Sequence, residues 1–268
     1  MKSVTLSDGR EIFFLQKNCA KENAPTILFV HGFPLDHSMW LGQLPLVEQA
    51  SLVMVDLSGF GRSTTLASAE LTMRSFADDL AELLTQLQIP KVIFCGLSMG
   101  GYIAWEFAAA YPQLLDSLIC CNTRAAADQE NIARGRRVAA AQVRKTGTES
   151  VAEAMKEKLF SPTTIIQNPQ LIKRVCASIR ATDAEMVARG QLAMAIRQDH
   201  SLRLGEINCR VLVIAGNDDQ ITPADEMLPM SLMLNNGTFV EIAEAGHLAP
   251  AEQPESFNRA VEHWLSAR

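Results

Sequence analysis

The chain has 268 residues, of which 48% are hydrophobic and 20% charged, and it carries 24 Lys and Arg residues against 30 Asp and Glu residues. This length suits one large α/β domain, or a domain with a small insertion, whose core needs no disulfide or metal for stability. A formal charge of −6 without a cluster of Lys and Arg argues against a nucleic-acid-binding protein.

The first segment, residues 1–9, contains no long apolar stretch of the kind found in a signal peptide. No later apolar run approaches the roughly 20 residues that span a membrane. The six cysteines form no C-x-x-C pair and lie mostly within apolar runs, which is typical of reduced, structural thiols. We therefore expect a soluble, cytoplasmic protein with no membrane partner.

Short apolar runs follow one another along the chain and predict the strands of a sheet. Most of these runs are apolar on both faces, which is typical of parallel strands covered by helices on both sides. The pattern predicts an α/β fold with a mostly parallel central sheet of about eight strands flanked by helices. The runs lie at residues 11–17, 26–30, 52–55, 92–95, 118–121, 211–215 and 239–242.

Helical patterns occupy the segments between these runs. An apolar stripe at helical spacing covers residues 73–87, with Thr72 placed as its N-cap, and a second helix is expected at 101–111. Proline at the first helical position predicts two more helices, which follow Thr222 and Gln253.

Residues 123–204 differ from the rest of the chain because they contain almost no strand-like run. Two patterns typical of capping boxes, at 150–153 and 182–185, predict helix starts within this segment. We therefore predict an α/β core formed by residues 1–122 and 205–268, interrupted by a helical cap at 123–204. Ligands of such folds bind at the carboxyl ends of the parallel strands, so the residues just after each run are the candidates for chemistry.

Ser98 lies in the first of these strand-end segments, within Gly96-Leu97-Ser98-Met99-Gly100. The pattern G-x-S-x-G between a buried strand and a helix is typical of a nucleophile elbow. Its two glycines allow a tight turn that places the serine hydroxyl at the head of the helix. The helix N-terminus and free main-chain N–H groups there favour the negative charge of a tetrahedral intermediate. Ser98 is therefore the candidate nucleophile.

Two further strand ends offer the partners that a catalytic serine needs. Asp218 and Asp219 follow the run at 211–215, and a carboxylate there would orient a histidine and stabilise its imidazolium. Turn formation accounts for one of these two aspartates. His247 follows the last run, where a neutral imidazole is suited to accept a hydroxyl proton near neutral pH.

With these motifs in place, the whole chain resembles an α/β-hydrolase. The order serine, aspartate, histidine along the chain is the order found in that family. Residues 31–36, His-Gly-Phe-Pro-Leu-Asp, resemble the family's oxyanion loop, and residues 56–63 resemble its D-x-x-G-x-G-x-S segment. The resemblance places the acid at Asp219 rather than Asp218. Asn122, near the position where some hydrolases carry the acid, supports this choice.

The same resemblance implies an oxyanion hole formed by the main-chain N–H groups of Phe33 and Met99, with the helical cap over the pocket. Trp40 lies just beyond the oxyanion loop and is a candidate for contact with the substrate, whereas its large apolar side chain favours the core. The sequence has no dinucleotide fingerprint, no phosphate-binding loop and no zinc-ligand spacing. We therefore expect no organic cofactor and no metal.

Serine rather than aspartate at the elbow argues against the haloalkane dehalogenases and epoxide hydrolases of this family. The elbow and oxyanion segments look most like small carboxylesterases, 3-oxoadipate enol-lactonases and cofactor-free haloperoxidase or perhydrolase relatives. We expect a serine hydrolase that cleaves small carboxylic esters or lactones through an acyl-enzyme, with the triad Ser98, His247 and Asp219. The alternatives are an enol-lactonase, a perhydrolase or a C–C bond hydrolase on the same triad, a lyase that uses the same serine and histidine differently, and a ligand-binding receptor without turnover. The sequence leaves the oligomeric state open.

Overall fold

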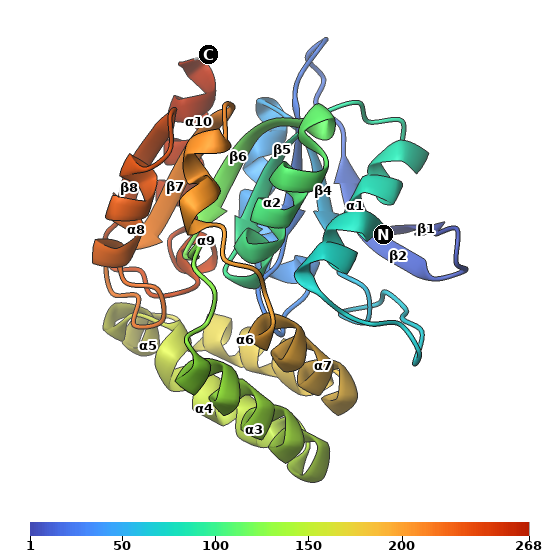
Figure 1. The fold of residues 1–268 in the computed structure, drawn as a ribbon. Helices are drawn as coiled ribbons and strands as arrows, with labels where there is room; N and C mark the ends of the chain where they lie inside the picture. The colour runs from blue at the N-terminus through green and yellow to red at the C-terminus, as the bar shows by residue number, and fades with distance from the viewer. Residues whose placement is uncertain (268) are drawn as a thin grey trace.

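Eight strands form a single sheet in the computed structural model, which describes residues 1–267 (Figure 1). They span Lys2–Thr5 (β1), Glu11–Lys17 (β2), Thr26–Val30 (β3), Ser51–Val55 (β4), Val92–Leu97 (β5), Leu115–Cys121 (β6), Arg210–Gly216 (β7) and Gly237–Ile242 (β8). Their order across the sheet is β1-β2-β4-β3-β5-β6-β7-β8. The β1–β2 and β2–β4 pairs are antiparallel and the other neighbouring pairs are parallel, so the predicted mostly parallel sheet is confirmed.

The parallel strands are apolar on both faces because apolar clusters lie on both sides of the sheet. In β3, Leu28 and Val30 belong to the cluster on one side, whereas Ile27 and Phe29 belong to the cluster on the other. This alternation follows from the period of two residues in a strand. All four side chains are fully buried, so the strand is fixed in position and so is the start of the loop that follows it.

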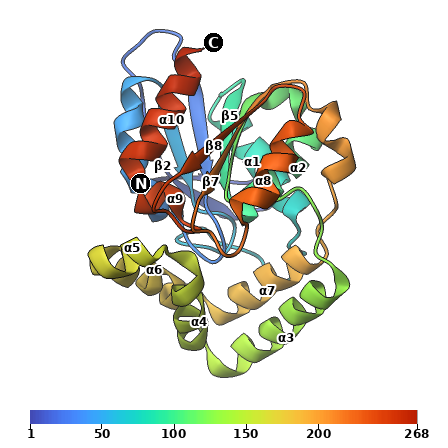
Figure 2. The same cartoon turned by 90° about the vertical axis from the view of Figure 1, so that its left-hand side faces the viewer.

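Helices cover both faces of the sheet and form a further layer at one of its ends. They span Met73–Gln86 (α1), Met99–Ala110 (α2), Glu130–Thr146 (α3), Glu149–Leu159 (α4), Pro162–Gln167 (α5), Pro169–Ala181 (α6), Ala184–Ala195 (α7), Ala224–Leu232 (α8), Ala249–Glu252 (α9) and Pro254–Ser266 (α10), with 3-10 helices at His37–Glu48 (η1), Pro112–Leu114 (η2) and Ser201–Glu206 (η3). The helices α1, α2 and α8 cover one face, and η1, α9 and α10 cover the other (Figure 2). No helix within residues 1–267 is both long and apolar enough to cross a membrane.

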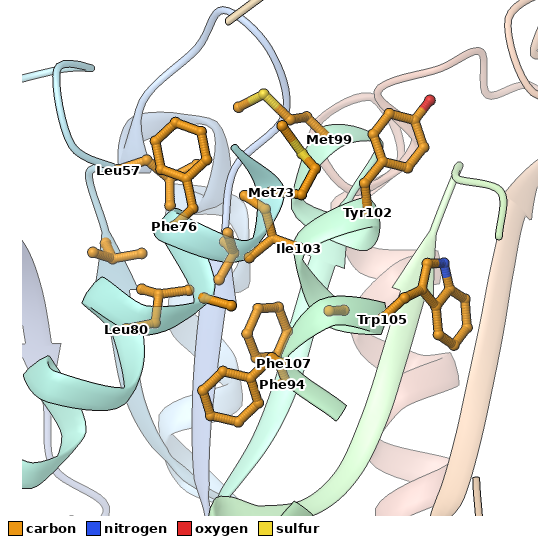
Figure 3. Packing of buried hydrophobic residues seen from close by; sticks show 14 of the residues in the cluster. Leu57, Met73, Phe76, Leu80, Phe94, Met99, Tyr102, Ile103, Trp105 and Phe107 are labelled. Carbon is orange, nitrogen blue, oxygen red and sulfur yellow. The ribbon is translucent and has the colours of Figure 1, made fainter. Parts of the chain in front are cut away.

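The layer formed by α1 and α2 is held by a large apolar cluster (Figure 3). α1 begins after Thr72, as predicted. The Thr72 hydroxyl accepts a hydrogen bond from the Ser75 N–H, and the Ser75 hydroxyl accepts one from the Thr72 N–H. Phe107 of α2 packs against Phe94 of β5, with ring centroids 5.1 Å apart. These contacts fix the position of α2, whose first turn follows the candidate nucleophile.

The helices α3–α7 form what we call the helical insertion, residues 130–195, between β6 and β7. In both ribbon views these helices lie together beyond one end of the sheet (Figures 1 and 2). Within the insertion α3 packs along α7, and α4 packs against α6. The segment contains helices and no strand, in agreement with its sequence pattern.

Both capping boxes predicted in this segment are wrong. α4 already begins at Glu149, so Ser150 lies inside its first turn and does not cap the helix. α7 is capped by Asp183, whose carboxylate accepts hydrogen bonds from two N–H groups of the first turn. Thr182 instead follows the end of α6 and donates its hydroxyl proton to Pro34 O at 3.0 Å. A contact to a distant loop therefore replaces the predicted local one.

Candidate active site

Ser98 occupies the sharp turn between β5 and α2. Its backbone has φ 53° and ψ −112°, outside the regions that L-residues favour, and the residue remains partly exposed. The helix begins at Met99, two residues earlier than the sequence pattern predicts. A Cβ atom on Gly96 would collide with the main chain of Gly100, and one on Gly100 would collide with the carbonyl oxygen of Val30. The close approach of main chains therefore requires both glycines.

Gly100→Ala is expected to destabilise the fold, because the new methyl group would meet rigid backbone. Overpacking of this kind costs about 1–3 kcal/mol in the free energy of unfolding. Gly135 of α3 provides a matched control, since no heavy atom lies within 4 Å of its Cβ position. Gly135→Ala should stabilise its helix by about 0.5–1 kcal/mol. Urea unfolding measures both changes, and an unaffected midpoint in Gly100→Ala would contradict the packing argument.

Asp219 and His247 follow β7 and β8, and their side chains are in hydrogen-bond contact. His247 Nδ1 lies 2.8 Å from Asp219 Oδ2, and both side chains are buried. Asp219 Oδ1 accepts hydrogen bonds from the main-chain N–H groups of Ile221 and Thr222. Burial opposes ionisation, but the charge and hydrogen bond of His247 and the other donors outweigh it and lower the pKa of Asp219 to about 2. An anionic Asp219 favours the tautomer with the proton on Nδ1, which leaves Nε2 free to accept a proton.

Two side chains that the sequence analysis did not assign to the site support Asp219. Asn122, at the end of β6, donates from Nδ2 to Asp219 Oδ2 at 2.8 Å and to Gly246 O at 3.3 Å. Thr222 donates its hydroxyl proton to the same Asp219 oxygen at 2.6 Å. Their only sequence signal is a polar residue just after a buried strand or in the turn beyond it. Asp218 forms no side-chain hydrogen bond within residues 1–267, so the geometry favours Asp219 as the acid.

Ser98 and His247 line one cavity of about 590 Å³. The α/β part of the chain also contributes Phe33, and the helical insertion contributes side chains from α3, α4 and α7 such as Met194. Asp219 does not line the cavity and contacts only the Nδ1 side of the imidazole. The cavity therefore offers a serine hydroxyl and a histidine to a molecule bound within it.

The loop after β3 carries Phe33, one of the two expected oxyanion donors. Phe33 lines the cavity, and no group within residues 1–267 accepts a hydrogen bond from its main-chain N–H. Met99, the other expected donor, is the first residue of α2, where a main-chain N–H has no partner within its own helix. His31 holds the loop, since its Nδ1 lies 2.9 Å from Gly32 O and its Nε2 accepts from the Leu57 N–H at 3.1 Å. Burial lowers the pKa of His31, so the neutral ring is favoured.

The structure places Trp40 in the core rather than at the cavity, which is the other of the two places that its sequence position allows. Its side chain is fully buried, and its ring centroid lies 5.0 Å from that of Phe29 and 6.1 Å from that of Phe257. It is not among the residues that line the cavity. Trp40 therefore belongs to the core between β3, η1 and α10. A sequence window around Trp40 does not identify its partner in the core, because Phe257 lies near the other end of the chain.

Three basic side chains, Arg124, Arg136 and Lys158, line the cavity. Arg136 pairs with Asp128 at 2.5 Å, but Asp128 also pairs with Arg197 at 2.6 Å, so one negative charge faces two positive charges. Arg124 pairs with an exposed glutamate of α8, whereas Lys158 forms no ion pair within residues 1–267. The cavity therefore carries an excess of positive charge, although the whole chain has a formal net charge of −6.

Asp36, His37 and Asp56 form a group that could offer three ligand atoms to a metal, all within 4.8 Å of one another. Asp56 Oδ1 accepts hydrogen bonds from the main-chain N–H and from Nδ1 of His37, and its Oδ2 accepts one from the Arg62 N–H. Asp36 accepts hydrogen bonds from the Ser38 N–H and from a serine hydroxyl of α6. Each carboxylate oxygen is already bonded, so the group is explained as a support for the loops after β3 and β4.

The sequence profile of the α/β hydrolase fold family matches residues 25–254, and the chain belongs to this family. The 3-oxoadipate enol-lactonase 2 of Acinetobacter baylyi is 30% identical over 239 residues, which cover 89% of this chain and 87% of that protein. Among solved structures, a thermophilic esterase from Thermogutta terrifontis with bound malate is 36% identical, with a TM-score of 0.94 over 99% of this chain and 98% of that one. The enol-lactonase of Burkholderia xenovorans LB400 shares the fold at 24% identity, with a TM-score of 0.90 over 99% of this chain and 100% of that one. The chain is thus an enzyme of a hydrolase family and resembles enol-lactonases and esterases.

Proposed function

We propose that this protein is a serine hydrolase that cleaves small carboxylic esters or lactones. The 2.8 Å contact between His247 Nδ1 and Asp219 Oδ2, beside a cavity that Ser98 and His247 both line, carries the proposal. Ser98 Oγ attacks the substrate carbonyl carbon while His247 Nε2 takes the hydroxyl proton. His247 then gives this proton to the departing alkoxide oxygen, and an acyl ester remains on Ser98. In a lactone, the released hydroxyl stays attached to the acyl group.

Water completes the reaction by a second attack on the same carbonyl carbon. His247 takes a proton from the water molecule, and the C–O bond to Ser98 breaks as the serine oxygen regains a proton from His247. The products are a carboxylic acid and the free enzyme. The N–H groups of Phe33 and Met99 stabilise the oxyanion in both halves of the reaction, and each such donor lowers the barrier by about 3 kcal/mol.

Residues 123–204 act in this proposal as a cap on the core formed by 1–122 and 205–268. Side chains of α3, α4 and α7 line the same cavity as Ser98, which supports this role. The helical insertion therefore selects the substrate, while the loops at the strand ends carry out the chemistry. Relatives named as an enol-lactonase and an esterase support lactones and esters as the substrate class.

The excess of positive charge in the cavity favours substrates that carry a carboxylate away from the bond that is cleaved. The Thermogutta esterase, which holds malate, a dicarboxylate, supports this direction. We expect a monoester of glutarate to show a higher kcat/KM than the uncharged pentanoate ester of the same alcohol. Added salt should reduce the difference, because it screens charges near the surface.

Lys158→Ala should lower the preference for the glutarate monoester about threefold to tenfold, since this cation lines the cavity and forms no ion pair among the described residues 1–267. Lys156→Ala is the matched control, because Lys156 lies on the same helix but does not line the cavity. The measurement is the ratio of kcat/KM for the two esters. The same ratio in Lys158→Ala and in the wild type would contradict the charge argument.

The proposed activity is tested with p-nitrophenyl esters from acetate to decanoate and with simple lactones. Rapid hydrolysis, together with attachment of a fluorophosphonate to Ser98 detected by mass spectrometry, would support a serine hydrolase. Product formation that requires peroxide would favour a perhydrolase instead. Ligand binding without turnover of any of these esters or lactones would favour a receptor and overturn the proposal.

A further inference from the structure

Glu252 is the last residue of α9, a helix that lies at the end of the sheet facing the helical insertion (Figure 2). Its buried carboxylate contacts the loop that carries His247. Its Oε1 accepts hydrogen bonds from the Gly246 N–H at 2.9 Å and from the Leu248 N–H at 3.2 Å. These main-chain groups lie on both sides of the histidine. Burial raises the pKa of Glu252, while the hydrogen bonds that it accepts favour its charged form. The carboxylate forms no ion pair within residues 1–267, so its partners are hydrogen-bond donors alone.

The second carboxylate oxygen of Glu252 binds the helical insertion. Oε2 accepts a hydrogen bond from the N–H of Ser161, the N-cap of α5, at 2.7 Å. The end of α4 and the start of α5 make two more contacts with the loop that carries His247. The Ser161 hydroxyl donates to Glu244 O at 2.9 Å, and the Leu248 N–H donates to Leu159 O at 3.2 Å. Glu252 therefore joins the two flanks of His247 to the start of α5.

We propose that Glu252 is a positioning residue that couples the placement of His247 to the docking of the helical insertion. This inference rests on the proposed function, because it assumes that His247 moves the proton of Ser98. A carboxylate can accept hydrogen bonds on both oxygens, so it holds N–H groups from two segments at once. Neither Glu252 nor Ser161 lines the cavity, so their effect on the rate passes through the main chain beside His247. A misplacement of about 1 Å can lower the rate about 100-fold.

Glu252→Gln tests the carboxylate itself. The amide has nearly the same size, but only one of its two terminal atoms accepts a hydrogen bond, so its NH₂ group must face an N–H donor on one side. We expect kcat to fall about 10- to 100-fold, with KM within about twofold of the wild-type value. Glu255→Gln, at an exposed carboxylate in the first turn of α10, is the matched control and should change neither constant. The proton resonance of His247 Nδ1–H should shift in Glu252→Gln and not in the control.

A pair of variants at Ser161 tests the contact from the insertion side. Ser161→Pro removes the N–H, and its backbone angles of φ −65° and ψ 156° already suit proline. Phe160, at φ −117° and ψ 148°, also suits the position before a proline. Ser161→Ala loses the same hydroxyl but keeps the N–H, so the comparison isolates the loss of the N–H contact together with the displacement of the Glu252 carboxylate by the proline ring. We expect kcat in Ser161→Pro to be about tenfold below that in Ser161→Ala, at similar KM.

Thermal unfolding of each variant ensures that the rates refer to folded protein, and the Ser161 pair remains informative if Glu252→Gln does not fold. Equal kcat in the two Ser161 variants, or a change confined to KM, would overturn the coupling. His247→Ala separates this inference from the proposed function. If His247→Ala remains active, the proposed function fails. If His247→Ala is inactive while Glu252→Gln and Ser161→Pro keep wild-type kcat, only the coupling fails.

Discussion

The Ser98→Ala variant is expected to lose about three to six orders of magnitude in kcat for ester hydrolysis. Without the hydroxyl no acyl-enzyme forms, and only binding and oxyanion stabilisation remain to assist attack by water. The fold should be unaffected, because the Ser98 hydroxyl forms no hydrogen bond within residues 1–267 and its side chain borders the open cavity. Steady-state rates on the preferred ester, together with the thermal unfolding midpoint, measure both expectations.

The control for Ser98→Ala is Ser68→Ala, at an exposed position outside the cavity, which should retain wild-type rates. Fluorophosphonate labelling should disappear in Ser98→Ala and persist in Ser68→Ala. Substantial ester hydrolysis by purified Ser98→Ala would show that another group attacks the carbonyl. The proposed mechanism would then be wrong, whereas the membership in the α/β hydrolase fold family would stand.

The sheet and the turn at Ser98 could be predicted because their signals are local. A buried parallel strand is visible as a run that is apolar on both faces. Each run predicted from the sequence lies within a strand of the structure. The two glycines of the turn are visible as the G-x-S-x-G pattern, although one of the contacts that requires them is with the end of β3, far away along the chain. The pattern itself is local, so a window of sequence is enough to find it.

The supports of His247 could not be predicted in the same way. Glu252 reads as an ordinary charged residue near a helix start, and only the fold brings its carboxylate to Ser161. Asn122 and Asp219 come from neighbouring strands that lie far apart along the chain. Trp40 shows the same limit, since its position after the oxyanion loop suits a pocket and its apolar ring suits the core, and only the fold shows that the ring packs into the core. Contacts of this kind follow from topology, which residue spacing alone does not specify.

Asp219→Asn is expected to lower kcat by about four orders of magnitude. The amide cannot stabilise the imidazolium by its charge, and it no longer favours the tautomer with the proton on Nδ1. Asp218→Asn is a closely matched control, because Asp218 has no side-chain hydrogen bond within residues 1–267 and should keep wild-type activity. Loss of activity in Asp218→Asn with retention in Asp219→Asn would assign the acid to the other residue.

The same pair of variants tests the electrostatics of the site through its dependence on pH. The pKa of Asp219 is lowered from 3.8 to about 2 in the folded protein, so the unfolded chain binds a proton more readily. Its contribution to stability is therefore fully present above about pH 4 and is lost as the pH falls toward about 2, a change of about 2 kcal/mol. Urea unfolding at a series of pH values should show an acid-dependent loss that is about 2 kcal/mol smaller in Asp219→Asn than in the wild type and Asp218→Asn. The remaining loss comes from other carboxyl groups whose pKa is lowered, such as those of Asp36 and Asp128. Parallel curves for all three proteins would show that the folded state does not stabilise the Asp219 anion, and the tautomer argument for His247 would lose its basis.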